Sequence, residues 1–405
     1  MEKIRIYFRP IWYNIMHHKA YAGFCVFGTM LTFLFVMILL QIIHVVQSNT
    51  TPALYAERVI GVPSRVLQEQ GNGSGRQWKR EDMETLMSLL KGYENYICCH
   101  DKASNFKING QLGTCMALYT DYNYWNVFHF NFVQGNPFPE REQYERCAIV
   151  KESLAKMYFA KEDVLGEEIY FQGNTYRIIG VVADVSLFAQ DGNISLWLPL
   201  HSNQEMVNEN RVSTYILFPE GADIVKAKTM VANVVNRVAE MKNININLSP
   251  EKLLTVQEVR AGVLGMGLMG SVGAILILLA IPVLNIILLS SANTSIQVSE
   301  IGIKRALGAN RNFVFLEILV ENIILVMVGI LLGVVLLLPV CQYIDRLLFA
   351  NTILGTMTIL AEVNWMVIFL EVLPLSLLFS LVSGGLPSYG IVRFPIVDML
   401  KGGVK

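Results

Sequence analysis

The residues that could perform chemistry in this 405-residue chain are a few charged side chains next to long apolar runs. Glu317, Glu321 and Glu371 fall inside such runs, and a carboxylate within a membrane span is costly and is therefore a functional candidate. Glu317 and Glu321 are four residues apart, so a helix would place them on one face. A proton relay in a secondary transporter is one interpretation of this pair.

Pairing with nearby cations is the alternative interpretation, and the one we favour. Both glutamates lie in the first turns of the apolar run 313–340, close in sequence to Lys304, Arg305 and Arg311. Long cationic side chains at a membrane surface can reach such carboxylates. The large polar middle region and the lack of an inverted repeat also argue against a proton-coupled carrier.

No other set of residues in the sequence indicates catalysis, a cofactor or a metal. The phosphate-binding pattern G-x-x-x-x-G-K-[ST] does not occur, so this chain is not expected to bind or hydrolyse ATP. Cys98, Cys99, Cys115 and Cys147 lack zinc-site spacing and are expected to be unpaired thiols. A bridge such as Cys115–Cys147 stays open if this region faces an oxidising compartment. We expect no catalytic, cofactor-binding or metal-binding residue here, and no enzymatic activity.

The composition indicates an integral membrane protein. The chain is 53% hydrophobic and only 16% charged, whereas about 25% of residues are charged in an ordinary soluble domain. The formal net charge of −1 gives no reason to expect nucleic acid as a partner. Crossing a bilayer takes about 20 apolar residues. The runs that we expect to be transmembrane helices are residues 21–46, 263–291, 313–340 and about 364–383.

The distribution of basic residues orients these expected helices. Lys and Arg gather in residues 1–20, in the loop 293–311 and in the tail 387–405, so these segments are expected in the cytoplasm. Apolar residues at helical spacing in 1–20 predict an amphipathic helix on the membrane surface. Residues 47–260 contain alternating strand and helix patterns, which indicate a mixed α/β domain. Within it we expect helices at 152–159 and 224–238, a hairpin of 168–171 and 175–182 with positive φ angles at the Gly173-Asn174 step, a strand at 245–248, and core packing of the aromatic stretch 119–132. We therefore predict an α-helical membrane protein with four transmembrane helices and a large mixed α/β extracytoplasmic domain between helices 1 and 2.

The short basic loop between the second and third apolar runs is the candidate site. Its apolar members can pack into a partner's groove, its cations can pair with a partner's acids, and its glycines permit close approach or a sharp exit. Further along, Gly329 and Gly333 have the spacing of close helix packing in lipid. The loop residues are Glu300, Ile301, Gly302, Ile303, Lys304, Arg305, Ala306, Leu307, Gly308 and Ala309.

This organisation resembles the MacB/FtsX-like family of ABC-transporter permeases. The resemblance is carried by the loop residues 300–309 with Glu321, Gly329 and Gly333 beyond them, by the block 148–184, and more weakly by 394–400. Gln297 and Ser299 stand where the family usually has basic residues. The resemblance implies that residues 47–260 are a MacB-like periplasmic core domain and residues 261–405 an FtsX-like permease domain.

The resemblance also implies a function. The chain would be a permease subunit in the bacterial inner membrane, with both termini cytoplasmic and the large domain periplasmic. A separate cytoplasmic ABC ATPase would bind ATP and dock on the loop, and a second permease subunit would form a homo- or heterodimer. Efflux, lipoprotein release or control of an envelope enzyme would be the work done, with a periplasmic adaptor or envelope protein and membrane lipid as further partners. A sensor or scaffold without powered transport and a proton-coupled carrier using Glu317 and Glu321 are the alternatives.

Overall fold

The computed structural model divides the chain into two compact units. The first, here called the helical unit, comprises Met1–Ile42, Gly267–Val340 and Val363–Lys405. The second, the α/β unit, comprises Ile43–Met266 and Cys341–Glu362. The structure describes residues 12–13, 15–17, 19–62, 65–66, 76–142, 145–159, 161–203, 212–244, 247–262, 298–349, 357–393, 395–396 and 399.

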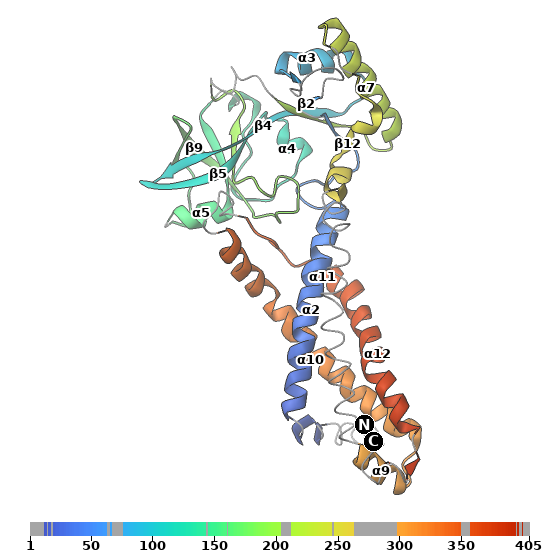
Figure 1. The fold of residues 1–405 in the computed structure, drawn as a ribbon. Helices are drawn as coiled ribbons and strands as arrows, with labels where there is room; N and C mark the ends of the chain where they lie inside the picture. Colours follow the sequence, from blue (N-terminus) through green and yellow to red (C-terminus); the bar gives the residue numbers. More distant parts are fainter. Residues whose placement is uncertain are drawn as a thin grey trace. The chain divides into compact units, whose positions relative to one another are not determined.

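Long apolar helices make up the helical unit (Figure 1). Among the described residues, three stretches are long and apolar enough to cross a membrane: Ala22–Gln47, Arg311–Phe349 and Trp365–Val382. The expected span 263–291, and most of the expected surface helix 1–20, lie outside the described residues. The helices are α2 (Lys19–Gln47), α9 (Val298–Ala306), α10 (Arg311–Phe349), α11 (Trp365–Val367), the π-helical turn η3 (Ile368–Val372) and α12 (Leu373–Val392).

Helix α10 is longer than the sequence predicted. The apolar run was expected to end at residue 340, but the helix continues through Pro339 to Phe349, and its last residues belong to the α/β unit. Arg346, which lies beyond the expected end of the run, is therefore helical. The prediction failed because hydropathy reports the apolar stretch alone, and a helix can continue beyond it where other contacts satisfy its last turns.

Small residues and aromatic rings join the long helices of this unit. A Cβ at Gly329 of α10 would lie 2.8 Å from Cβ of Thr29 in α2, which shows how closely these two helices approach. A Cβ at Gly384 of α12 would overlap the Asn322 side chain of α10. Without such small residues, these backbones could not come so near one another.

The α/β unit is built on a sheet whose strands close into a ring. The strand order runs β12-β1-β11-β4-β5-β10-β7-β9-β6, and β8 pairs with both β4 and β9. The path β4-β5-β10-β7-β9-β8 therefore returns to β4. The strands of this sheet are β1 (Val59–Val62), β4 (Asn95–Ile108), β5 (Gln111–Thr120), β6 (Phe132–Gly135), β7 (Cys147–Lys151), β8 (Glu168–Phe171), β9 (Asn174–Val182), β10 (Leu196–Pro199), β11 (Ser213–Leu217) and β12 (Leu254–Thr255). Strands β2 (Arg65–Val66) and β3 (Arg76–Gln77) pair with each other in a separate two-stranded sheet.

Two tight turns organise this ring. The long hairpin β4–β5 reverses at Asn109 and Gly110, whose φ angles are 50° and 84°. The hairpin β8–β9 was predicted, but its positive φ angles were expected at the Gly173-Asn174 step. They occur instead at Gln172 (46°) and Gly173 (78°), so the turn begins one residue earlier. This is the pair of left-handed residues that a two-residue turn requires.

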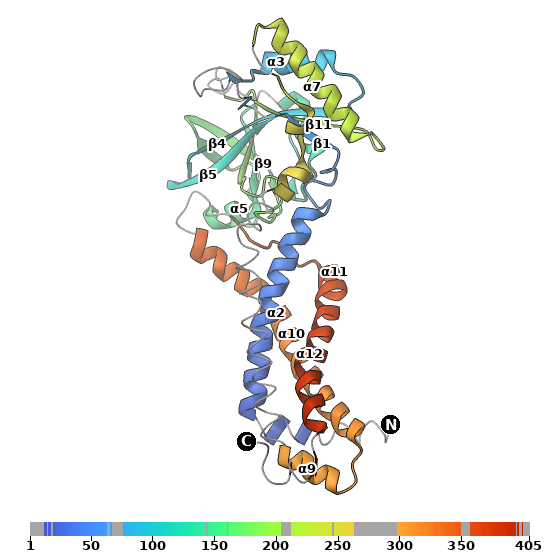
Figure 2. The ribbon, with the colours of Figure 1, turned by 45° about the vertical axis from the view of Figure 1, so that its right-hand side comes forward.

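Helices cover the α/β unit and two hydrophobic clusters fill it. Helices α3 and α7 lie side by side in both views (Figure 2). Helix α7 buries a stripe of alanine and valine side chains. The aromatic stretch 119–132, expected to be core, contributes Tyr124, Trp125 and Phe128 to one cluster. A predicted strand at 245–248 is wrong at its described end, because Leu248 instead pairs its backbone with the Asn236 side chain. The helices are α3 (Arg80–Leu89), α4 (Tyr124–Val127), α5 (Glu152–Tyr158) and α7 (Ile224–Met241).

Candidate functional site

The basic loop of the sequence forms helix α9 and a sharp exit from it. Residues 298–306 are helical, and Gly308 then takes a φ of +98°, a conformation that side chains with a Cβ rarely adopt. The Gly308 amide donates to the Arg305 carbonyl oxygen (3.1 Å) and the Ala309 amide to that of Lys304 (3.0 Å). Helix termination by a left-handed glycine is the ordinary way of pairing these last carbonyl groups. The Glu300 side chain lies outside the described residues.

Helix α9 has a packed face and a bare face. Ile301 and Val298 are buried in a cluster with residues of α10, α12 and the C-terminal segment: Val314, Val392 and Met399. Ile303 is 52% exposed and Leu307 84% exposed. One side of the helix is therefore held by the rest of the helical unit, while large apolar side chains stand on the other.

An ion pair joins α9 to the start of α10. Lys304 Nζ lies 2.9 Å from Glu317 Oε1. The Glu317 side chain is only 4% exposed, whereas the Lys304 side chain is 37% exposed. The glutamate thus has a cationic partner near the end of the helix, as the cation-pairing interpretation requires.

Arg305 connects α9 to the C-terminal segment. Its guanidinium is buried, and Nη1 donates to the Val392 carbonyl oxygen (2.9 Å) and contacts Met399 Sδ (3.7 Å). The bond reaches across 87 positions of sequence to the end of α12. An arginine can satisfy a terminal carbonyl group of a helix in this way. Sequence reasoning anticipated a cation here but not this partner.

The remaining predicted residues are spread along the helical unit. Glu321 is buried one turn beyond Glu317, and Glu371 is exposed within the π-helical turn η3. Gly329 and Gly333 face helix α2, where a Cβ at Gly333 would lie 3.0 Å from Cε of Met37. The structure therefore brings α9, Glu317 and the C-terminal segment together. Glu371 is distant from them in sequence and lies in a different element, η3.

The described residues contain no group of three or more His, Cys, Asp or Glu that could hold a metal ion. The cysteines of the strands are buried thiols: Cys98, Cys99, Cys115 and Cys147. Burial raises the pKa of the Cys98 and Cys115 thiols to about 12, which disfavours the reactive thiolate. These cysteines are therefore core residues.

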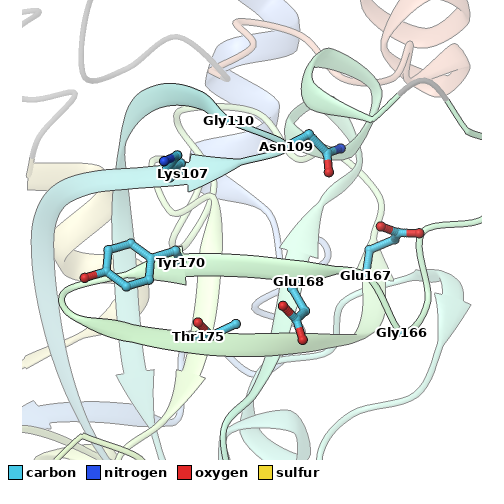
Figure 3. Close-up of a pocket in the computed structure, with 8 residues that line it drawn as sticks. All are labelled: Lys107, Asn109, Gly110, Gly166, Glu167, Glu168, Tyr170 and Thr175. Atoms are coloured by element: carbon cyan, nitrogen blue, oxygen red, sulfur yellow. The ribbon is translucent and has the colours of Figure 1, made fainter.

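An open groove of about 470 Å³ lies on the outside of the strand ring (Figure 3). Lys107 of β4 and Tyr170 of β8 stand on neighbouring strands along it, and Glu168 and Thr175 continue the row. These side chains are exposed. A shallow polar groove without buried polar groups lacks the features of a ligand pocket, so we do not place the site here.

Comparison with known proteins gives two family matches. The family described as MacB-like periplasmic core domain matches residues 23–234, and the FtsX-like permease C-terminal family matches residues 272–396. The crystal structure of the periplasmic region of MacB from Actinobacillus actinomycetemcomitans aligns with 51% of this chain and 93% of that chain, at a TM-score of 0.41 and 15% identity. The extracellular domain of the transporter YknZ aligns with 47% of this chain and 97% of that one, at a TM-score of 0.40 and 15% identity.

Full-length relatives agree with these matches. An uncharacterized ABC transporter permease of Bacillus subtilis (strain 168), YknZ, is 26% identical over 220 residues, which are 52% of this chain and 53% of that protein. The macrolide export ATP-binding/permease protein MacB of Escherichia coli O157:H7 is 28% identical over 221 residues, which are 53% of this chain and 33% of that protein. The matched region is thus about half of one relative and a third of the other. With apolar helices and an α/β unit of this kind, the protein is a membrane protein with an extracytoplasmic domain, and it belongs to the MacB/FtsX-like family of ABC transporter permeases.

Proposed function

We propose that this permease couples ATP hydrolysis by a separate cytoplasmic ATPase to conformational work outside the membrane. The chain has four spans in the bacterial inner membrane, both termini are cytoplasmic, and the α/β unit is periplasmic. Helix α9 is the docking element for the ATPase, and two permease subunits form the transporter. Efflux, lipoprotein release and control of an envelope enzyme are the kinds of work that this architecture would serve.

The observation that carries the proposal is the two-sided character of α9. Its packed face is fixed by Ile301, by the Lys304–Glu317 pair and by the Arg305 bond to Val392. A force applied to the bare face would therefore reach α10 and the end of α12 through these contacts. The bare face carries Ile303 and Leu307, and exposed apolar side chains of this size on a short surface element are typical of a partner contact.

The Lys304–Glu317 contact also weighs against a proton-coupled carrier. A carboxylate that relays protons needs a path to a proton donor or acceptor, whereas Glu317 Oε1 lies 2.9 Å from Lys304 Nζ in an ion pair. A sensor or scaffold remains the rival in which no nucleotide-hydrolysing partner exists.

Co-purification tests the docking assignment. Leu307→Glu places a carboxylate on the bare face of α9, and the ATPase that co-purifies with the tagged wild-type protein should be lost. Val225→Glu is the matched control, because Val225 is 74% exposed on α7 of the other unit. Loss of the ATPase in both variants, or in neither, would contradict the assignment of α9. Absence of any ATPase from the wild-type preparation would favour the scaffold.

Labelling of single cysteines tests the proposed orientation. Leu307→Cys should react with a membrane-impermeant maleimide only from the cytoplasmic side, and Leu112→Cys at the exposed β4–β5 hairpin only from the periplasmic side. Both positions are exposed, and the native cysteines are buried, so the background should be low. Labelling of both from one side would refute the proposed topology.

A further inference from the structure

The outer end of α10 and the segment that follows it belong to the α/β unit. Cys341–Glu362 form part of this unit, although both neighbouring stretches of sequence belong to the helical unit. Within it, residues 357–360, here called the outer strap, follow the last turns of α10. Met357 and Leu360 at the two ends of the strap are buried.

The outer strap is bonded to residues 185–192, here called the receiving loop. Ser186 and Thr358 form a parallel β-bridge, and the Leu187 amide donates to the Thr358 carbonyl oxygen (2.7 Å). Ser186 Oγ donates to the Ile359 carbonyl oxygen (2.6 Å), and Thr358 Oγ1 donates to that of Val185 (3.2 Å). Hydrogen bonds from the backbone and from side chains of both segments therefore hold the outer strap against the receiving loop.

Helix α10 holds the strap from the other side. The Ile359 amide donates to Asp345 Oδ1 (2.9 Å), and Asp345 is a buried residue of the last turns of α10. The strap thus lies between the helix that precedes it and the receiving loop. A displacement of the end of α10 would be passed to the loop through these bonds.

A buried lysine shapes the receiving loop. Lys151, at the end of β7, is 1% exposed, and its Nζ donates to the carbonyl oxygens of Gly192 (3.0 Å) and Val185 (3.4 Å) at the two ends of the loop. A Cβ at Gly192 would overlap the Ser186 carbonyl oxygen, so the loop closes tightly on itself. Burial lowers the pKa of Lys151 to about 8. Burying an ammonium group costs free energy, so a lysine is unusual in a core unless its hydrogen bonds are needed there.

The loop is also anchored from inside the domain. Tyr124 donates its hydroxyl proton to Asp191 Oδ2 (2.6 Å), and Trp197 Nε1 donates to the Tyr124 hydroxyl (3.2 Å). Asp191 has a φ of 53°, which places the loop in a left-handed turn at this residue. These hydrogen bonds hold the receiving loop rigidly against the core of the domain.

We propose that the outer strap is a permanent joint between α10 and the periplasmic domain, and that Lys151 is the residue that positions the receiving loop for it. Resting on the proposed function, this joint is a route by which movement of the spans enters the domain.

A designed disulfide tests the joint without reference to transport. Bridge partners lie close enough for a disulfide, so Ser186→Cys/Thr358→Cys in the full-length protein should oxidise almost completely in detergent and in membranes. Thr229→Cys/Thr358→Cys is the mismatched control, since Thr229 is exposed on α7 and is not bridged to Thr358. Equal, low cross-linking of both pairs would overturn the proposal.

Lys151→Met tests the positioning role, with Lys156→Met on the exposed face of α5 as the matched control. Loss of the Lys151 bonds should speed amide exchange at Leu187 by about tenfold or more and lower the cross-linking yield of the bridge pair. The melting temperature of the whole protein should stay the same, because the variant also removes the free-energy cost of burying an ammonium group. An unchanged Leu187 exchange rate would refute the role of Lys151.

ATP hydrolysis by the co-purified complex tests permanence. A joint that never opens predicts that oxidising the 186–358 pair leaves the hydrolysis rate within about twofold of the reduced protein. A loss on oxidation that a reductant reverses would show that the strap must release, and would overturn the permanent joint. If no ATPase co-purifies, the proposed function fails, whereas the cross-linking and exchange measurements still decide the strap.

Discussion

Replacing Lys304 by methionine should loosen helix α9 far more than replacing its partner Glu317 by glutamine. The two charges are 2.9 Å apart but unequally buried, with 4% of the Glu317 side chain exposed and 37% of the Lys304 side chain. Removing the lysine leaves a carboxylate in a place that water hardly reaches. Removing the carboxylate leaves an ammonium group that can turn into solvent.

The difference can be estimated from this asymmetry. Breaking a buried pair by removing one partner costs about 3–5 kcal/mol, and the partial exposure of Lys304 reduces this to about 2–3 kcal/mol for Lys304→Met. The contribution of an exposed pair is about 0–1 kcal/mol, which is the expected cost of Glu317→Gln. The double variant removes both charges and should lie within about 1 kcal/mol of the wild type, so the two changes are strongly non-additive.

Amide hydrogen exchange of the full-length protein in nanodiscs measures this opening directly. The Leu307 amide donates to the Ile303 carbonyl oxygen (3.0 Å) in the last turn of α9, so its exchange reports unfolding of the helix end. A cost of about 2–3 kcal/mol accelerates exchange by roughly 30- to 150-fold, because about 1.4 kcal/mol corresponds to a factor of ten. Arg311→Met, which removes an exposed cation at the start of α10, is the control.

Two outcomes would refute the reasoning. If Glu317→Gln accelerates exchange as much as Lys304→Met, the glutamate is held by something other than this pair. If Lys304→Met leaves exchange unchanged, the buried carboxylate does not need its cation, and the mechanical link between α9 and α10 through this pair is absent.

The remaining predictions concern both units. Gly308→Leu should destabilise the end of α9 by about 1–2 kcal/mol and uncouple ATP hydrolysis from transport, because a φ of +98° disfavours any side chain; unimpaired transport would refute this. Gly329→Leu should lower the melting temperature by forcing α10 away from Thr29, whereas Gly23→Leu, where a Cβ would meet nothing within 4 Å, should not; equal shifts would contradict the packing. Burial raises the pKa of Asp121 to about 7, so the free energy of unfolding should fall as pH rises from about 4 to about 7. Asp121→Asn should therefore raise the melting temperature at pH 8 and leave it unchanged near pH 4. A difference in melting temperature that does not depend on pH would be evidence against the burial of this carboxyl group.

The features with a local signal were predictable from the sequence. Apolar length identified the regions of α2, α10 and α12, and periodicity identified helices such as α5 and α7. The two glycines of the α10 packing face have a local spacing that needs no knowledge of their partner. The two faces of α9 were not distinguished from the sequence: Ile301, expected with the other apolar residues of the loop to meet a partner, is buried against α10, α12 and the C-terminal segment.

Long-range pairing was not predictable in the same way. The closure of the ring through β8 depends on contacts between strands that carry no local sign of their pairing. The hairpin β4–β5 does carry a local signal, the dipeptide Asn109-Gly110 that is typical of two-residue turns, but this signal was not recognised. Arg305 was expected to meet an acid, but it meets the Val392 carbonyl oxygen, a group that every residue carries. The burial of Lys151 was not predictable from the sequence either, because a lysine that ends a strand is usually solvated.

The π-helical turn η3 contains one residue more per turn than an α-helix and lies at the head of the last apolar helix. If Ile368–Val372 wound as a regular α-helix with the same number of residues, the extra residue would rotate everything downstream by about 100°. Gly384 would then turn away from Asn322 and another side chain would be wedged into that contact. The wide winding of this one turn therefore sets the rotation of α12 about its own axis, and with it the side of α12 that faces α10.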